Sequence, residues 1–314
     1  MNQKPLIILT GPTSVGKTAL SIALAKSIHG EIISADSMQV YKGMDIGTAK
    51  ITPQEMEGVC HYLIDELAPE EEFNVLKFQQ LAKKYIQEIY NKGKIPILVG
   101  GTGFYIQAVL YDIDFTENET GDYRKELEEL LKEQGPQYLY DMLKAIDPES
   151  ANTLHPNNSK RVIRALEFAK ENKSKLSEHN KEQRNKISPY LFSYFVLNKD
   201  RTKLYETINQ RVDIMLEKGL LDEVIKLKEA GYFRGLVSMQ GIGYKEILAY
   251  LDGECTLEEA VEILKRDTRH FAKRQLTWFR REKEVTWVNK DDFANDDEVL
   301  QFMLEELKAK EIIV

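Results

Sequence analysis

The segment Gly11–Thr18 constrains this chain more than any other stretch, because few folds can use its spacing. It reads GPTSVGKT, the P-loop pattern of glycine, four residues, glycine, lysine and a hydroxyl residue. An apolar run precedes it at Leu6–Leu9, and a helix-forming stretch with apolar residues three and four apart follows at Ala19–Lys26. A strand, a glycine loop and a helix in this order predict a binding site for phosphate groups.

The loop has the chemical groups that a polyphosphate needs. Its backbone N–H groups can turn inward, the helix N-terminus adds a partial positive charge, and Lys17 adds a full one. Thr18 is the residue expected to hold Mg²⁺ between phosphate oxygens. A chance glycine turn is the alternative, and the flanking strand and helix argue against it. The candidate phosphate-binding residues are Gly11, Pro12, Thr13, Ser14, Val15, Gly16, Lys17 and Thr18.

Charge and composition bound the class of protein. The chain has 314 residues and a net charge of −8, so it is not coated in basic charge. A local basic segment nevertheless runs from Lys265 to Lys283, so the net charge does not exclude nucleic acid as a partner. No apolar run approaches a membrane span, and Cys60 and Cys255 lie far apart with no metal-type spacing. We therefore expect a cytoplasmic protein that does not enter a membrane.

Two further apolar runs end in segments of chemical interest. Ile32–Ile33 leads to Asp36, and Ile95–Val99 leads to the glycine-rich turn Gly100–Tyr105 with Thr102 exposed. Ligands of open parallel sheets bind at the carboxyl ends of the strands, so both segments should face the same crevice as the Gly11–Thr18 loop. From its position alone, Asp36 could be a catalytic base, a helix N-cap or a magnesium ligand.

The chain changes character between residues 114 and 186. This section is polar and helix-prone, with amphipathic stretches at Glu126–Glu133 and Tyr138–Ile146. Its last part, 170–186, has few apolar residues, and we expect it to be mobile. The section is therefore predicted to be a helical insertion domain.

Strand signals return at Tyr190–Leu197, so an α/β core resumes after the insertion. Val59–Asp65 is another candidate strand, and we interpret its His61 as a packed side chain rather than a catalytic one. The sequence predicts an α/β fold in which residues 1–113 and 187–314 form a P-loop NTPase-like parallel sheet, flanked by helices that include the C-terminal ones.

Cations gather on two predicted helices. Lys160, Arg161 and Arg164 lie near the start of one helix, where their charges oppose the helix dipole and an anion could compensate, although spacing alone slightly favours a solvated face. Leu257–Glu282 reads as one long helix with basic residues at helical spacing beside aromatic ones, which favours nucleic acid over a merely solvated side. Its candidate contacts are Arg269, Lys273 and Arg280.

Six segments in register resemble the tRNA dimethylallyltransferases, also called tRNA isopentenyltransferases, of the bacterial type. They are GPTSVGKT, SADSMQVY at 34–41, GGTGFY at 100–105, KRVIRALE at 160–167, QGIGYKE at 240–246 and RHFAKRQLTWFRR at 269–281. The resemblance implies transfer of a dimethylallyl group from dimethylallyl diphosphate to the N6 amine of the adenine on the 3′ side of the tRNA anticodon, with release of diphosphate. One departure is Cys60 ahead of His61, where relatives often have a second histidine.

The resemblance also implies roles for individual residues. Asp36 resembles the general base, Thr13 a residue near the departing oxygen, and Arg211 a residue near the diphosphate that the Gly11–Thr18 loop and Mg²⁺ would hold. Gln39 could bond the adenine edge, and the protein is expected to be a monomer. Positions matching tRNA contacts are Asp36, Ser37, Met38, Gln39, Thr102, Arg124, Lys160, Arg161, Val162, Ile163, Arg164, Gln240, Gly241, Ile242, Gly243, Tyr244 and Lys245.

Three other functions share part of this pattern. A prenyltransferase acting on free adenine nucleotides would need neither the insertion nor the basic helix. A small-molecule kinase or nucleotide-driven switch would use the same loop, but the chain has no obvious apolar run ending in aspartate unless Asp36 serves as one. A non-catalytic tRNA-binding protein would not depend on Asp36.

Overall fold

The computed structural model describes residues 3–115 and 122–314, apart from the side chain of Arg184, and it divides into two compact units. Met1–Leu110 and Pro189–Val314 belong to the first unit, and Tyr111–Ser188 forms the second. The predicted boundaries at 114 and 186 fall inside the second unit, near its two ends. Each unit has its own apolar core.

The first unit is built on a parallel sheet with the strand order β3-β2-β4-β1-β5-β6. In the central register, Ile8 lies beside Leu98 on one side and Tyr194 on the other. This confirms the predicted α/β fold. The strands are β1 (Lys4–Thr10), β2 (Gly30–Ala35), β3 (His61–Tyr62), β4 (Ile95–Gly100), β5 (Tyr190–Asn198) and β6 (Val285–Asn289).

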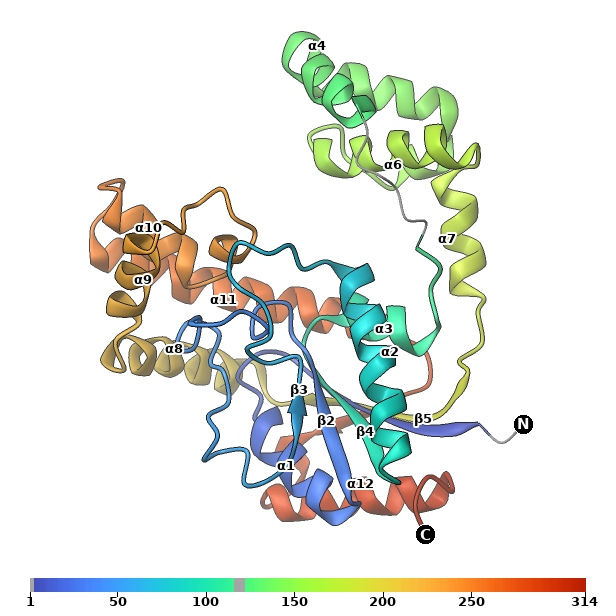
Figure 1. Cartoon of the computed structure of the whole chain (residues 1–314), viewed down its shortest axis with the longest axis vertical. Coiled ribbons are helices and arrows are strands. Elements are labelled where there is room, and N and C mark those ends of the chain that lie inside the picture. The colour runs from blue at the N-terminus through green and yellow to red at the C-terminus, as the bar shows by residue number, and fades with distance from the viewer. Residues whose placement is uncertain (1–2, 116–121) are drawn as a thin grey trace. The chain divides into compact units, whose positions relative to one another are not determined.

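Helices cover the sheet on both faces, as the continuous apolar strands require (Figure 1). Ile7 and Leu9 of β1 point into the core shared with α1 and α12, and the alternation of a strand sends Leu6 and Ile8 to the opposite face. The helices of this unit are α1 (Lys17–Ser27), α2 (Val75–Asn91), α3 (Gly103–Leu110), α8 (Arg201–Glu217), α9 (Leu220–Glu229), α10 (Tyr244–Leu251), α11 (Leu257–Phe279) and α12 (Asp296–Ala309).

The second unit is helical where it is described. Its α4 bends at Gly135, whose φ of 80° and ψ of 173° lie outside the helical region, directly before Pro136. The two predicted helices 126–133 and 138–146 are therefore the two halves of one bent element. The helices are α4 (Asp122–Ile146), α5 (Pro148–Asn152), α6 (Ser159–Asn172) and α7 (Leu176–Arg184).

A buried carboxylate ties the helices of the second unit together. Asp147 accepts hydrogen bonds from the backbone N–H and the hydroxyl of both Ser150 and Ser177, at 2.6–3.0 Å. These bonds hold the pKa of Asp147 at about 2, because they outweigh the burial that favours the neutral form. The segment 170–186, which we expected to be mobile, contains the end of α6 and the helix α7, and Ser177 is bound to Asp147 at the start of α7.

Three features of the first unit differ from the expectations. The candidate strand Val59–Asp65 pairs only at His61–Tyr62, because Leu63 turns into the left-handed region at φ 62°. The long basic helix ends at Phe279, so Arg280 lies at its cap. Strand β6 was not predicted, and α12 was expected only in general, as one of the C-terminal helices.

Candidate active site at the carboxyl edge of the sheet

The Gly11–Thr18 loop leaves the end of β1 in a conformation that its small residues allow. Gly11 has a φ of 147°, and a Cβ there would lie 2.5 Å from the carbonyl oxygen of Leu197 in β5. Ser14 and Gly16 also have positive φ, and α1 begins at Lys17. The Lys17 ammonium donates to the carbonyls of Gly11 and Pro12, at 2.9 and 2.8 Å. The loop therefore closes around its own lysine.

Lys17, Arg211 and Asp36 lie within electrostatic range of one another. The pKa of Lys17 is lowered to about 7, mainly by burial and then by the charge of Arg211, while Asp36 opposes the shift. Burial also lowers the pKa of Arg211, again against the effect of Asp36. A Cβ added at Gly16 would come within 2.8 Å of the Lys290 ammonium. Cations from α1, α8 and the end of β6 thus surround the loop, and the carboxylate at residue 36 lies on the same edge of the sheet.

Gln275 of α11 forms hydrogen bonds with the Gly11–Thr18 loop and with the turn after β4. Its Oε1 accepts the N–H of Thr13 at 2.9 Å, and its Nε2 donates to the carbonyl of Gly101 at 3.0 Å. The side chain is 6% exposed. One turn of helix further on, Trp278 lies so close to Gly103 that a Cβ there would be 2.1 Å from the indole ring. The basic helix is therefore fixed directly to the Gly11–Thr18 loop and to the turn after β4.

Asp36 follows β2 in a tight turn. Its Oδ1 accepts the N–H groups of Met38 and Gln39, at 2.8 and 3.3 Å, in the manner of an Asx turn. The Gln39 side chain accepts from the hydroxyl of Ser34 and donates to the carbonyls of Thr48 and Ala49. The carboxylate of Asp36 thus keeps Oδ2 outside these bonds, while the whole turn is tied to the following loop.

The QGIGY segment packs against the same turn. A Cβ at Gly241 would lie 2.6 Å from the Met38 methyl group, and one at Gly47 would lie 2.6 Å from the ring of Tyr244. The Tyr244 hydroxyl donates a hydrogen bond to Oε1 of Glu223 at 2.6 Å. Segments that are far apart in the sequence therefore meet around the Asp36 turn, and Gly47 leaves room for the ring of Tyr244.

The predicted RNA contacts of the second unit divide into exposed and buried residues. Lys160, Arg161 and Arg164 are exposed on α6. Val162 and Ile163 are 0% and 3% exposed in the apolar core, so their side chains are not available to RNA and their assignment as contacts is corrected.

Arg124, the remaining predicted contact in the second unit, is occupied within that unit. It pairs with Glu128 and with the buried Glu167, at 3.2 Å in both cases. To contact RNA, Arg124 would have to release one of these carboxylates or bind the RNA while it keeps them.

The predicted RNA contacts of the first unit also include both exposed and buried residues. Gln240, Lys273 and Arg280 are exposed, and the last two line a cavity of about 550 Å³ beside the ends of β5 and β6. Gly243 and Tyr244 are buried, and Tyr244 packs against Gly47 as described above.

Other predicted contacts of this unit are engaged or only partly exposed. Lys245 pairs with Glu246 and Asp267, and Arg269 donates to Asn209 at 2.6 Å. Ser37, Thr102 and Ile242 are partly exposed. The freely accessible cations of this unit's predicted set are therefore Lys273 and Arg280.

The candidate magnesium ligand Thr18 is exposed in the first turn of α1. Among the described residues, no three His, Cys, Asp or Glu side chains are grouped as a metal site. A single hydroxyl suits an ion that takes its remaining ligands from a phosphate substrate and water. The buried hydroxyl of Ser14 also has no hydrogen-bond partner within the described chain.

His61 lies away from this group of turns, in the edge strand β3. Its Nδ1 is 2.9 Å from the carbonyl oxygen of Val59, and burial lowers its pKa. This is the geometry of a packed histidine.

Gln275 and Glu223 were not predicted from the sequence. Each of them binds residues more than a hundred positions away, and no local sequence pattern records such a contact. Within the described residues, no helix is long and apolar enough to span a bilayer.

Comparisons with known proteins agree with the geometry. The family model described as IPP transferase matches residues 39–282. A tRNA dimethylallyltransferase of Lachnoclostridium phytofermentans is 65% identical over 311 residues, covering 99% of both chains. One of Clostridioides difficile is 53% identical, covering 95% of this chain and 96% of its own length.

Solved structures give the same result. A tRNA isopentenylpyrophosphate transferase of Bacillus halodurans is 47% identical with a TM-score of 0.73, covering 99% of this chain and 98% of its own. A eukaryotic dimethylallyltransferase acting on tRNA is 30% identical with a TM-score of 0.84, covering 99% of this chain and 81% of its own. Identity at this level over the full length, together with five of the six motifs meeting at one sheet edge of the first unit, shows that the chain belongs to the tRNA dimethylallyltransferase family of enzymes.

Proposed function

We propose that this enzyme transfers a dimethylallyl group from dimethylallyl diphosphate to the N6 amine of the adenine 3′ to the anticodon of tRNA, and releases diphosphate. The observation that carries the proposal is the mutual electrostatic interaction of Lys17, Arg211 and Asp36. It supports one site in which cations for a leaving anion and a carboxylate for an incoming nucleophile act together.

The Gly11–Thr18 loop would hold the diphosphate. The Lys17 ammonium, now bonded to the loop carbonyls of Gly11 and Pro12, would turn to the phosphate oxygens, and Arg211 would add a second cation from α8. Thr13, whose N–H is fixed by Gln275, would keep its side chain near the bridging oxygen. Mg²⁺ held by Thr18 would supply further charge neutralisation for the leaving group.

Asp36 would act as the general base. An aromatic amine is a weak nucleophile, and its attack on the allylic carbon becomes easier if a base removes its proton as the bond forms. The Asp36 turn is tied down through Oδ1, which leaves Oδ2 for the amine proton. The adenine would have to leave its stack to reach this edge of the sheet.

The exposed cations on α6 and at the end of α11 would hold the RNA backbone. Lys160, Arg161 and Arg164 serve this purpose in the second unit, and Lys273 and Arg280 in the first. Such contacts position an RNA and make binding salt-dependent, whereas the turn residues Ser37–Gln39 and Thr102 would contact the base itself.

Incubation with labelled dimethylallyl diphosphate, followed by mass spectrometry of the acceptor, tests the proposal. We expect the adenine 3′ to the anticodon of an unmodified tRNA to gain the mass of one dimethylallyl group, and AMP to remain unmodified under the same conditions. Lys17→Ala should raise KM for the diphosphate substrate, because it removes the central cation of the loop. Transfer to AMP but not to tRNA would show that the acceptor has been misassigned.

A further inference from the structure

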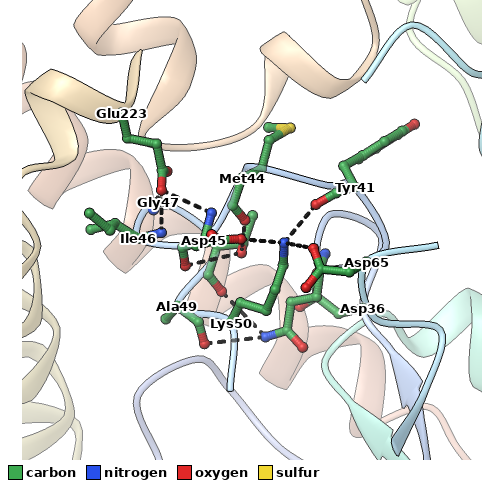
Figure 2. A network of polar contacts seen from close by, with 12 residues as sticks. Asp36, Tyr41, Met44, Asp45, Ile46, Gly47, Ala49, Lys50, Asp65 and Glu223 are labelled. Carbon is green, nitrogen blue, oxygen red and sulfur yellow. Dashed lines mark hydrogen bonds and ion pairs between the residues drawn. The ribbon is translucent and has the colours of Figure 1, made fainter. Parts of the chain in front are cut away.

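Glu223, in the first turn of α9, binds three consecutive backbone N–H groups of a distant loop (Figure 2). Its Oε2 accepts from Asp45 and Ile46, at 3.0 and 2.7 Å, and its Oε1 accepts from Gly47 at 3.1 Å. Oε1 also accepts the Tyr244 hydroxyl at 2.6 Å. One carboxylate therefore satisfies four donors, three of them on the backbone of a loop 176 to 178 residues away.

This arrangement requires an ionised carboxylate. All four partners are donors, and a carboxylate is acceptor-only through both of its oxygens. A glutamine side chain has nearly the same shape, but its amide NH₂ would face either the two donors now on Oε2 or the two on Oε1. Charge-assisted hydrogen bonds to backbone N–H groups are also stronger than neutral ones. The loop geometry thus depends on the charge of Glu223 and not only on its volume.

The far side of the same loop holds the Asp36 turn. The carbonyls of Thr48 and Ala49 accept from the Gln39 side chain, at 3.3 and 3.5 Å, and the Gln39 N–H donates to Asp36 Oδ1 at 3.3 Å. Lys50, whose side chain is 4% exposed, binds Asp45, Asp65 and the carbonyl of Tyr41, at 2.5–2.6 Å. The loop Gly43–Lys50 is thereby anchored at both ends, with Asp36 attached to its second half.

We propose that Glu223 is a positioning residue for Asp36, which it holds through the Gly43–Lys50 loop and Gln39. The inference rests on the proposed function, because it takes Asp36 to be the base. Glu223 does not reach the reacting atoms itself. Since Tyr244 of the QGIGY segment shares the same carboxylate, the position of the base is also tied to a segment that is predicted to meet tRNA.

Glu223→Gln is the variant that tests the charge requirement. We expect single-turnover transfer to saturating tRNA to fall about 10- to 100-fold, because small displacements of a catalytic group cost factors of this size. KM for dimethylallyl diphosphate should stay within a few-fold, since the Gly11–Thr18 loop is not part of this network. Glu229→Gln, which removes the same charge from the exposed end of α9, is the matched control and should keep the normal rate.

A double-mutant cycle separates positioning from general loss of structure. If Glu223 acts through Asp36, then Glu223→Gln should cost little further rate in an Asp36→Asn background. The same cost in both backgrounds would overturn the inference and leave the proposed function standing. A normal rate for Asp36→Asn alone would instead reject the proposed base.

Amide exchange gives a readout that does not depend on activity. In Glu223→Gln, peptides covering residues 43–50 and 36–41 should exchange faster, while peptides from β1 and β4 keep their protection. Unchanged exchange at 43–50 would overturn the inference. Loss of protection throughout the chain would indicate that Glu223→Gln unfolds. In that case Glu223→Asp, which keeps the charge on a shorter side chain, replaces it as the test, and the inference requires that it transfer faster than Glu223→Gln.

Discussion

The turns at the sheet edge and the helix α6 of the second unit hold their functional candidates in opposite ways. At the sheet edge, Asp36, Gln39 and Gln275 are fixed by hydrogen bonds to the backbone of neighbouring turns. On α6, Lys160 and Arg161 are exposed over a well-packed apolar core.

The difference fits the two tasks proposed above for these regions, which are catalysis at the sheet edge and RNA binding on α6. Bond formation needs groups held within a fraction of an ångström, which requires buried and satisfied neighbours. Attraction of a phosphate backbone needs charge in the right region and tolerates side chains that adjust. Substitutions at the sheet edge should therefore reduce turnover, and substitutions on α6 should change affinity and its dependence on salt.

The largest effect is expected at Asp36. Asp36→Ala should lower the rate of transfer at saturating substrates about 10²- to 10⁴-fold, the usual contribution of a general base. Binding of tRNA, measured by filter retention, should change by only a few-fold. Asp297→Asn, in the exposed first turn of α12, controls for the loss of a negative charge. A similar loss of tRNA affinity and of turnover would show that the sheet edge and α6 do not differ in the way proposed.

A large effect on stability, without direct loss of chemistry, is expected at Asp147. Asp147→Asn should cost the second unit about 3 kcal/mol, because an amide cannot accept from all four donors of Ser150 and Ser177. Amide exchange in peptides of α5 and α7 would measure it. Protection equal to that of the unchanged protein would show that the carboxylate does not hold these helices.

Acid should expose the same contribution. The pKa of Asp147 is lowered in the folded state to about 2, so its stabilisation is fully present above the ordinary pKa of an aspartate and is lost as the pH falls towards 2. The exchange protection of α7 should therefore decline over this interval in the unchanged protein and vary less in Asp147→Asn.

A smaller effect is expected at Gln275. Gln275→Met keeps the volume but leaves the Thr13 N–H and the Gly101 carbonyl without their partner, at about 1–3 kcal/mol for each buried group. We expect about a tenfold higher KM for dimethylallyl diphosphate, measured by steady-state kinetics. Thr277→Ala, exposed on the same helix, should leave KM unchanged. An unaltered KM in Gln275→Met would show that the loop keeps its shape without this contact.

The smallest effects are expected on α6. Lys160→Ala and Arg161→Ala should each weaken tRNA binding by a few-fold at moderate salt and reduce the salt slope by about one ion. The rate at saturating tRNA should be unchanged. Lys181→Ala, exposed on α7 and paired with Glu149, tests whether any cation of the unit has the same effect.

The strands of the sheet could be anticipated only in part, and their order was not predicted. Apolar runs and glycine turns predicted β1, β2, β4 and β5, because a strand buried on both faces has a local signature. Val285–Asn289 forms β6 because β5 offers it a free edge, and that condition is not written in its own residues. The left-handed Leu63 likewise shortens β3 against its β-forming composition.

The candidate site shows the same limit. Asp36 and the Gly11–Thr18 loop stand out because each follows a recognisable strand. Glu223 reads as an ordinary acidic residue in the first turn of a helix, and only the fold brings Asp45–Gly47 to it. Val162 and Ile163 were assigned to RNA by their motif, although the apolar stripe of α6 buries them.

The place at which the second unit enters the chain has one more consequence. Tyr111–Ser188 interrupts the connection from α3 to β5, and β5 pairs with β1 rather than with the strand that the chain has just left. Because the second unit lies in a connection and not in the sheet, a change in its length leaves the register of β5 with β1 as it is.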